Sequence, residues 1–165
     1  MSTHVDELKF HGFSVTSGIA NIPTAVVGEY GTGGPIIAFL GEYDALAGLS
    51  QKADVFYQDP IKKGQNGHGC GHNLLGSASM QAAVALRDWL KESNLPGVVR
   101  YYGCPAEEGG AAKTFMVRDK IFEDVDAAIT WHPGCLPGIV KGSSLANCRV
   151  DFTFEGRASH AAVSP

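Results

Sequence analysis

The sequence lacks a long apolar run, a strong excess of charge and a cysteine-rich segment. No apolar run in its 165 residues approaches the length needed to cross a bilayer. The first residues show no basic region followed by an apolar core, so no signal peptide is visible. The four cysteines are therefore interpreted as reduced thiols of a cytoplasmic protein. The formal net charge of −4 gives no electrostatic reason to expect a nucleic-acid or membrane partner.

Glycine, in contrast, is abundant. The chain has 21 glycines, whereas its 44% hydrophobic and 18% charged residues are ordinary for a folded globular protein. The glycines gather beside histidine, cysteine and glutamate rather than in a linker, which indicates loops that form a site. The length fits one domain of ordinary size, or one domain plus a piece of another.

A glycine-rich loop at residues 64–73 carries a thiol and two imidazoles within five residues. Cys70 and His72 are two apart, so they would face the same side of an extended segment, and His68 is a further candidate. Thiolate and imidazole are ligands that zinc and related transition metals prefer. The alternative is a flexible loop in which cysteine and histidine occur by chance. We favour a metal site.

Apolar runs that alternate with helix signals predict an α/β fold with a layered sheet. The expected strands are residues 24–30, 36–40, 98–104, 127–131 and 147–154. The expected helices are residues 5–13, 73–91 and 111–118, the second with Asn73 as its N-cap. The turn signal at residues 31–35 predicts a hairpin between the strands on either side of it. Residues 50–71 show no periodicity, and a loop of this length is usually functional.

Polar side chains follow three of the expected strands. Asp44, the pair Glu107 and Glu108, and His132 each come just past the carboxyl end of an apolar strand. Ligands of open α/β sheets bind at this edge. We therefore expect these side chains and the metal loop to assemble one site.

The two adjacent glutamates cannot easily point the same way, so they should have different roles. One can bind the metal while the other acts as general base toward a water whose pKa the metal lowers from about 16 to roughly 7. Asp44 could accept a hydrogen bond from a ligating histidine and fix its tautomer. The alternatives are a solvated glutamate pair, a strand that ends at the surface with Glu42 and Asp44, and a partly buried strand-end histidine at His132.

The other histidines and cysteines form no pattern. His4 and His11 are expected at the surface of the first helix, and spacing alone says nothing about His160. Three cysteines are expected to behave as small apolar residues: Cys104, Cys135 and Cys148.

Five motifs in order resemble those of a known enzyme family. They are GEYDAL at 41–46, GHGCGHN at 67–73, PAEEGG at 105–110, TWHP at 130–133 and SHAA at 159–162. The chain thus resembles the aminoacylase/carboxypeptidase family of two-metal metallopeptidases and amidohydrolases, and within it the branch of the aminobenzoyl-glutamate utilization protein B subunit. The resemblance implies the N-terminal part of a layered α/β/α catalytic domain at 1–146. It also implies the first strand of an inserted α+β lid or dimerisation domain at 147–165.

The resemblance also implies roles for the site residues. Two divalent transition-metal ions, manganese or zinc, would be bound by Cys70, His72, Glu108 and His132. Glu107 would be the general base, Asp44 would support catalysis, and His160 would hold the substrate. Metal-activated water would cleave the amide bond of an N-acyl or N-aroyl amino acid such as p-aminobenzoyl-glutamate.

The family chain is longer, and its last metal-ligand histidine lies beyond Pro165. The sequence therefore resembles the N-terminal portion of a larger enzyme, which would form a homodimer or pair with a related subunit. Other members carry aspartate where this chain has Asn73. Two alternatives stay open: a dipeptidase or general N-acyl amino acid deacylase of the same family, and a truncated, non-catalytic metal-binding remnant.

Overall fold

The computed structural model describes every residue except 140–141, 144, 149 and 165. The chain divides into two units, Met1–Gly134 and Cys135–Pro165, and each is described by itself. The helices and strands of the described residues all lie in the first unit. None of these helices is long and apolar enough to span a membrane.

One mixed sheet forms the centre of the first unit, with five strands in the order β1-β2-β4-β3-β5. The strands are β1 (Ser14–Ser17), β2 (Val26–Thr32), β3 (Ile36–Glu42), β4 (Gly97–Cys104) and β5 (Ala127–Ile129). β2 pairs antiparallel with both β1 and β4, whereas β3 pairs parallel with both β4 and β5. Because β3, β4 and β5 run the same way, their carboxyl ends meet at one edge of the sheet.

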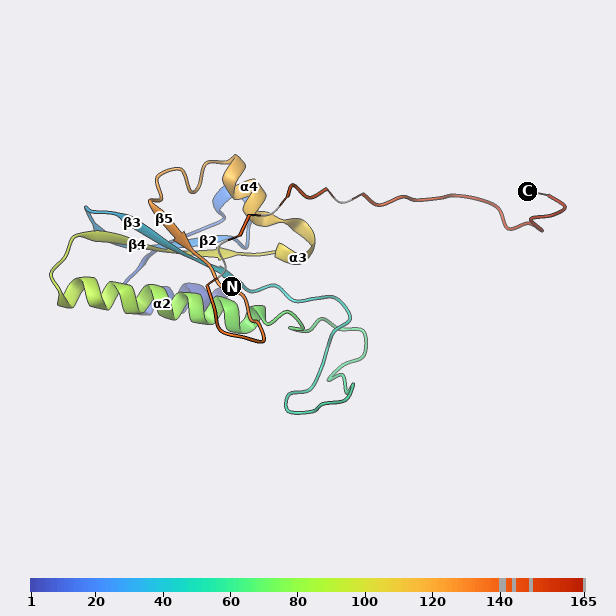
Figure 1. Ribbon diagram of the computed structural model, residues 1–165, viewed down its shortest axis with the longest axis horizontal. Coiled ribbons are helices and arrows are strands. Elements are labelled where there is room, and N and C mark those ends of the chain that lie inside the picture. The colour runs from blue at the N-terminus through green and yellow to red at the C-terminus, as the bar shows by residue number, and fades with distance from the viewer. Residues whose placement is uncertain (140–141, 144, 149, 165) are drawn as a thin grey trace. The chain divides into compact units, whose positions relative to one another are not determined.

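Helices cover both faces of this sheet, so the expected α/β/α layering is present. They are α1 (Ser2–Phe10), η1 (Ile19–Asn21), α2 (His72–Glu92), α3 (Glu107–Gly110) and α4 (Ala112–Arg118). Figure 1 shows α2 running along one face, with α4 on the opposite side of the strands.

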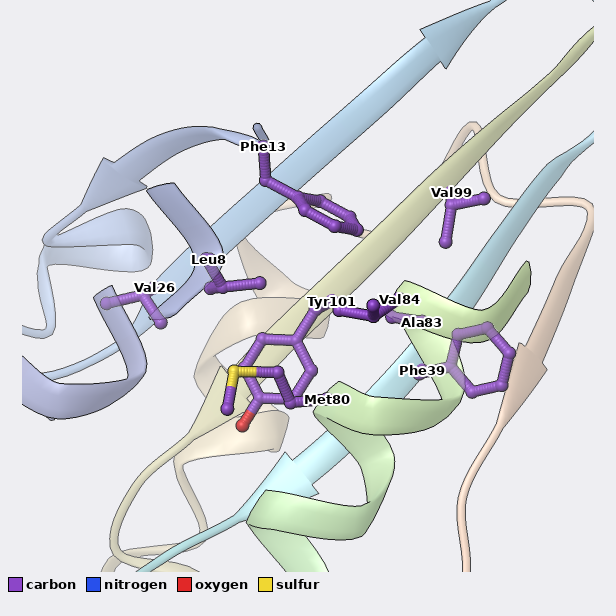
Figure 2. Packing of buried hydrophobic residues seen from close by; sticks show 9 residues of the cluster. All are labelled: Leu8, Phe13, Val26, Phe39, Met80, Ala83, Val84, Val99 and Tyr101. Carbon is purple, nitrogen blue, oxygen red and sulfur yellow. The ribbon is translucent and has the colours of Figure 1, made fainter. Parts of the chain in front are cut away.

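The core has two halves because successive strand residues point to opposite faces. Tyr101 of β4 packs on the side of α1 and α2, as Figure 2 shows, whereas its neighbour Tyr102 packs on the side of α4. The first half is formed by Leu8, Phe13, Val26, Phe39, Met80, Ala83, Val84, Val99 and Tyr101. The second half is centred on Ala38, Tyr102, Cys104 and Met116. Both faces of β4 are therefore buried.

The predicted hairpin between β2 and β3 is wrong, because β4 lies between these two strands. β4 pairs with β2 over seven positions, from Val26 opposite Gly103 to Thr32 opposite Gly97. β4 therefore has a neighbouring strand on each of its edges, and its residues are mostly buried on both faces of the sheet. The glycine-rich turn at 31–35 therefore connects two strands that are not neighbours.

The long helix begins one residue earlier than expected. His72 is its first residue and Gly71 its N-cap, not Asn73. Gly71 has a φ of 76°, and a Cβ there would lie 2.8 Å from Cγ of Pro133, so only glycine fits. This close approach brings the start of α2 against the segment that follows β5.

Three further expectations about local structure need correction. The residues of 147–154 that the structure describes form no strand, and Arg149 lies outside them. A strand needs a neighbour for its backbone hydrogen bonds, and the described residues of the second unit contain none. β5 is a strand as expected, but it ends at Ile129, two residues earlier than predicted. Cys135 and Cys148 are also exposed, whereas Cys104 is buried as expected.

His4 is half-buried rather than fully at the surface. Its Nδ1 lies 2.7 Å from the hydroxyl oxygen of Tyr101, and its ring centroid lies 5.1 Å from that of Tyr43. Burial lowers the pKa of His4, and the positive charge of the chain's N-terminus adds to the effect. The aromatic neighbours come from β4 and the end of β3, so sequence spacing within α1 could not reveal them.

Candidate metal centre

The polar residues expected at the sheet edge do gather there. β3 ends at Glu42, two residues before Asp44, and α3 begins with Glu107 just after β4. His132 follows β5, and the start of α2 brings in His72. Parallel pairing of the three strands places these segments at one edge.

His72 lies at the centre of this group and is only 1% exposed. Its Nδ1 lies 2.9 Å from Oδ1 of Asp44. Because a carboxylate only accepts, Nδ1 carries a proton and donates it to Asp44, so Nε2 is the ring nitrogen that faces the rest of the group. Nε2 is buried and has no hydrogen-bond partner among the described residues. A buried ring nitrogen without a partner is a candidate metal ligand.

Cys70 and His132 bring two further donors close to His72. Sγ of Cys70 lies 3.2 Å from Nε2 of His132, and the donor atoms of these three residues all lie within 4.8 Å of one another. Nδ1 of His132 donates to the carbonyl of Pro133 at 3.0 Å, so Nε2 is the ring nitrogen left to face Cys70. The three residues form a sulfur-and-nitrogen donor set of the kind zinc prefers.

The Cys70 thiol is affected by the carboxylates around it. A hydrogen bond with the Glu108 side chain is the main cause that raises the pKa of Cys70, and partial burial adds to it. The negative charges of Glu108, Glu107 and Glu42 act in the same direction. Without a cation, the cysteine is therefore held as the thiol rather than the thiolate.

Carboxylates also lie close to His72. Oε2 of Glu42 lies 3.1 Å from Nε2 of His72, and Glu107 joins these two in a second group whose donor atoms lie within 4.8 Å of one another. Oε1 of Glu108 lies 3.8 Å from the same nitrogen. The adjacent glutamates thus have different neighbours, since Glu108 also contacts Cys70.

The glutamates lie on α3, a single helical turn that the sequence did not predict. Ala106 and Ala111 flank it with φ values of 51° and 48°. This left-handed conformation costs a residue with a side chain about 1–2 kcal/mol. Oδ2 of Asp44 accepts a hydrogen bond from the backbone N–H of Glu108 at 3.0 Å and helps to hold the turn.

Sequence reasoning missed Glu42 and Lys113. Glu42 was considered only as the surface end of a strand, but it is 8% exposed and forms an ion pair with Lys113 of α4. The available signal was spacing, because Glu42 and Asp44 are two apart at the same strand end. No local pattern pointed to Lys113, which reaches the site only through the packing of α4.

Two histidines of the sequence motifs are not part of either donor group. His68 is exposed, and its carbonyl accepts from the N–H of Gly71 at 3.1 Å. His160 lies in the second unit, where its carbonyl accepts from the N–H groups of Val163 and Ser164 at 3.0 and 2.8 Å. Its substrate-binding role stays a prediction.

Comparisons with known proteins agree with the motif pattern, although no protein-family model matches the chain. The chain is 53% identical over 158 residues to the B subunit of p-aminobenzoyl-glutamate hydrolase from Escherichia coli strain K12, covering 96% of this chain and 33% of that protein. It is 34% identical over 154 residues to the A subunit of p-aminobenzoyl-glutamate hydrolase from the same strain, covering 86% of this chain and 35% of that protein. The chain belongs to the aminoacylase/carboxypeptidase family. It spans about a third of the length of these two relatives.

A solved structure supports the same fold. The crystal structure of a dinuclear metal binding peptidase of the M20 family from Bacillus subtilis matches with a TM-score of 0.62 and 22% identity. The match covers 77% of this chain and 34% of that one. The mixed sheet between helices is therefore the fold of a metallopeptidase catalytic domain.

Proposed function

We propose that the protein is a metal-dependent amidohydrolase that cleaves the amide bond of an N-acyl or N-aroyl amino acid. The observation that carries this proposal is the buried Nε2 of His72, which has no hydrogen-bond partner among the described residues yet lies between two donor groups. The substrate class rests on the 53% identity to a component of p-aminobenzoyl-glutamate hydrolase, so p-aminobenzoyl-glutamate is the first substrate to test.

Four residues would hold two divalent ions: Cys70, His72, Glu108 and His132. A thiol, two imidazoles and a carboxylate fit zinc or manganese, and bound ions would lower the pKa of water and polarise the amide carbonyl. The fold neighbour is a dinuclear metal binding peptidase, which supports a site for two ions.

Glu107 is the proposed general base. Its carboxylate belongs to the donor group with Glu42 and His72, where it can take a proton from the attacking water and pass it to the leaving nitrogen. Asp44 keeps the Nδ1 proton of His72 in place, so that Nε2 faces the site. His160 would hold the carbonyl or carboxylate of the substrate.

The setting of the enzyme is part of the same proposal. Residues 147–165 would begin a lid or dimerisation domain. The two relatives are named as different subunits of one hydrolase, which supports a related chain or a second copy as the partner. The four cysteines are free thiols, which supports a reducing cytoplasmic setting.

Replacement of Glu107 by glutamine tests the mechanism. Glutamine keeps the size of the side chain but cannot accept the proton, so we expect turnover of p-aminobenzoyl-glutamate to fall by about 10²–10⁴-fold. The metal content, measured by elemental analysis of the full-length protein, should stay unchanged.

Glu123→Gln is the matched control, because Glu123 pairs with Lys120 at an exposed position in the turns that follow α4 and should leave turnover intact. Unchanged turnover in Glu107→Gln would remove Glu107 from the base role. A full-length wild-type protein that contains no metal, or that keeps its activity after the metal is removed, would contradict the proposed function itself.

A further inference from the structure

Glu42 occupies a position that the roles proposed above do not explain. Its side chain is about one-tenth exposed and lies between the imidazole of His72 and the ammonium of Lys113. Oε2 lies 3.1 Å from Nε2 of His72, while Oε1 forms an ion pair with the ammonium of Lys113. The carboxylate therefore bridges α4 and the first turn of α2.

The contact between Glu42 and His72 has the spacing of two atoms that share one ion. Nδ1 of His72 donates its proton to Asp44, so Nε2 is the ring nitrogen that faces Glu42. Oε2 of Glu42 lies 3.1 Å from Nε2, yet the two atoms make no hydrogen bond, since Nε2 has no partner among the described residues. Donor atoms that share one ion lie about 3 Å apart, given metal–ligand distances of about 2.0–2.2 Å.

The surrounding charges favour the same arrangement. Glu107 and Glu108 lie close to this pair, and Asp44 lies on the other side of the imidazole. Carboxylates gathered this closely raise each other's free energy unless positive charge is present. Lys113 supplies one such charge, but it pairs with Oε1 of Glu42, whereas the oxygen near His72 is Oε2. It leaves Oε2 free for an ion.

We propose that Glu42 is a further ligand of the metal centre and that Lys113 is the positioning residue that holds it there. Oε2 of Glu42 and Nε2 of His72 bind the same divalent ion, while the Lys113 ion pair fixes the carboxylate rotamer. The proposal deepens the proposed function and rests on it, because it adds a ligand to the same site.

Metal binding by the full-length protein tests the proposal without any use of activity. Metal-free protein is titrated calorimetrically with Mn²⁺ alone. We expect Glu42→Gln to bind Mn²⁺ at least about tenfold more weakly than the wild type, and Lys113→Met to be weakened by a smaller factor. The double variant should match Glu42→Gln, because Lys113 acts only through Glu42. Lys113→Arg keeps the charge and should restore most of the affinity.

The exposed ion pair of Lys120 and Glu123 provides the matched control. Glu123→Gln and Lys120→Met remove the same groups at an exposed position and should bind Mn²⁺ like the wild type. Thermal unfolding of each metal-free variant checks that it folds. If Glu42→Gln does not fold, Glu42→Asp takes its place, because it keeps the charge but withdraws the carboxylate by one methylene.

The outcomes separate the two proposals. Wild-type affinity in a folded Glu42 variant overturns the ligand role of Glu42, and wild-type affinity in Lys113→Met overturns the positioning role of Lys113. In both cases the metal centre of the proposed function survives. A wild-type protein that binds no Mn²⁺ and no Zn²⁺ overturns the proposed function, and the Glu42 proposal with it.

Discussion

The two carboxylate oxygens of Asp44 accept hydrogen bonds from two different helices. Oδ1 accepts from Nδ1 of His72 in α2, and Oδ2 accepts from the backbone N–H of Glu108 in α3. One carboxylate thus fixes both the tautomer of a proposed ligand and the position of the turn that carries the two glutamates. Such supporting groups commonly change metal affinity as strongly as some ligands do.

Asp44→Asn should weaken Mn²⁺ binding by about 10–100-fold. Asparagine has one acceptor oxygen, so it can satisfy His72 or the N–H of Glu108, but not both. The measurement is calorimetric titration of the metal-free protein. Asp6→Asn, at an exposed position of α1, is the control. Equal affinities in the two variants would show that Asp44 does not orient His72.

At the scale of elements, the sequence predicted the parts that depend on local pattern. Apolar runs marked β3, β4 and β5, and the polar residues after them marked the edge where the candidate site lies. The hairpin was wrong because turn chemistry at 31–35 cannot show that a distant strand enters between β2 and β3. Glu42 and Lys113 were missed for the same reason, since they meet only after α4 has packed on the sheet.

α1 offers a test of how the helices are held to the sheet. Leu8 is the one buried residue of this helix, and a Cβ added at Gly28 of β2 would lie 3.0 Å from its side chain. Leu8→Ala should lower the free energy of unfolding by about 2–5 kcal/mol, because it removes buried surface and leaves a cavity.

Phe10→Ala in the same helix is the control, because Phe10 is 83% exposed and its loss should change the stability by about 0.5 kcal/mol or less. Denaturant unfolding measures both variants. Similar losses for the two would mean that α1 does not pack on β2 through Leu8.

At the scale of the first unit, buried weak acids make the fold sensitive to alkali. Burial raises the pKa of Cys104 from 9.0 to about 12, and it raises the pKa of Tyr101 and Tyr43 above their ordinary values as well. A group whose folded-state pKa is raised contributes stability that is fully present below its unfolded pKa. That contribution is lost as the pH rises toward the folded pKa.

We therefore expect stability to fall above pH 9, the unperturbed pKa of the Cys104 thiol, by about 1.4 kcal/mol per pH unit for each group involved. Denaturant unfolding at a series of alkaline pH values measures the slope. Of the three groups, the Cys104 thiol has the lowest unfolded-state pKa. Cys104→Ala removes it, so the fall in stability with pH just above pH 9 should be shallower than in the wild type. Identical slopes would show that Cys104 does not ionise on unfolding.

The place of β4 between β2 and β3 also sets the order in which the chain can assemble during synthesis. β1, β2 and β3 leave the ribosome first, but β2 and β3 have no pairing with each other. β2 can pair with β1 at once, but its other edge and the whole of β3 stay unpaired until residues 97–104 have been made, after the long loop and α2. Pairings between such distant segments are slow to form and leave strand edges open in the meantime. The nascent chain is therefore most exposed to aggregation after β3 has been synthesised and before β4 has emerged.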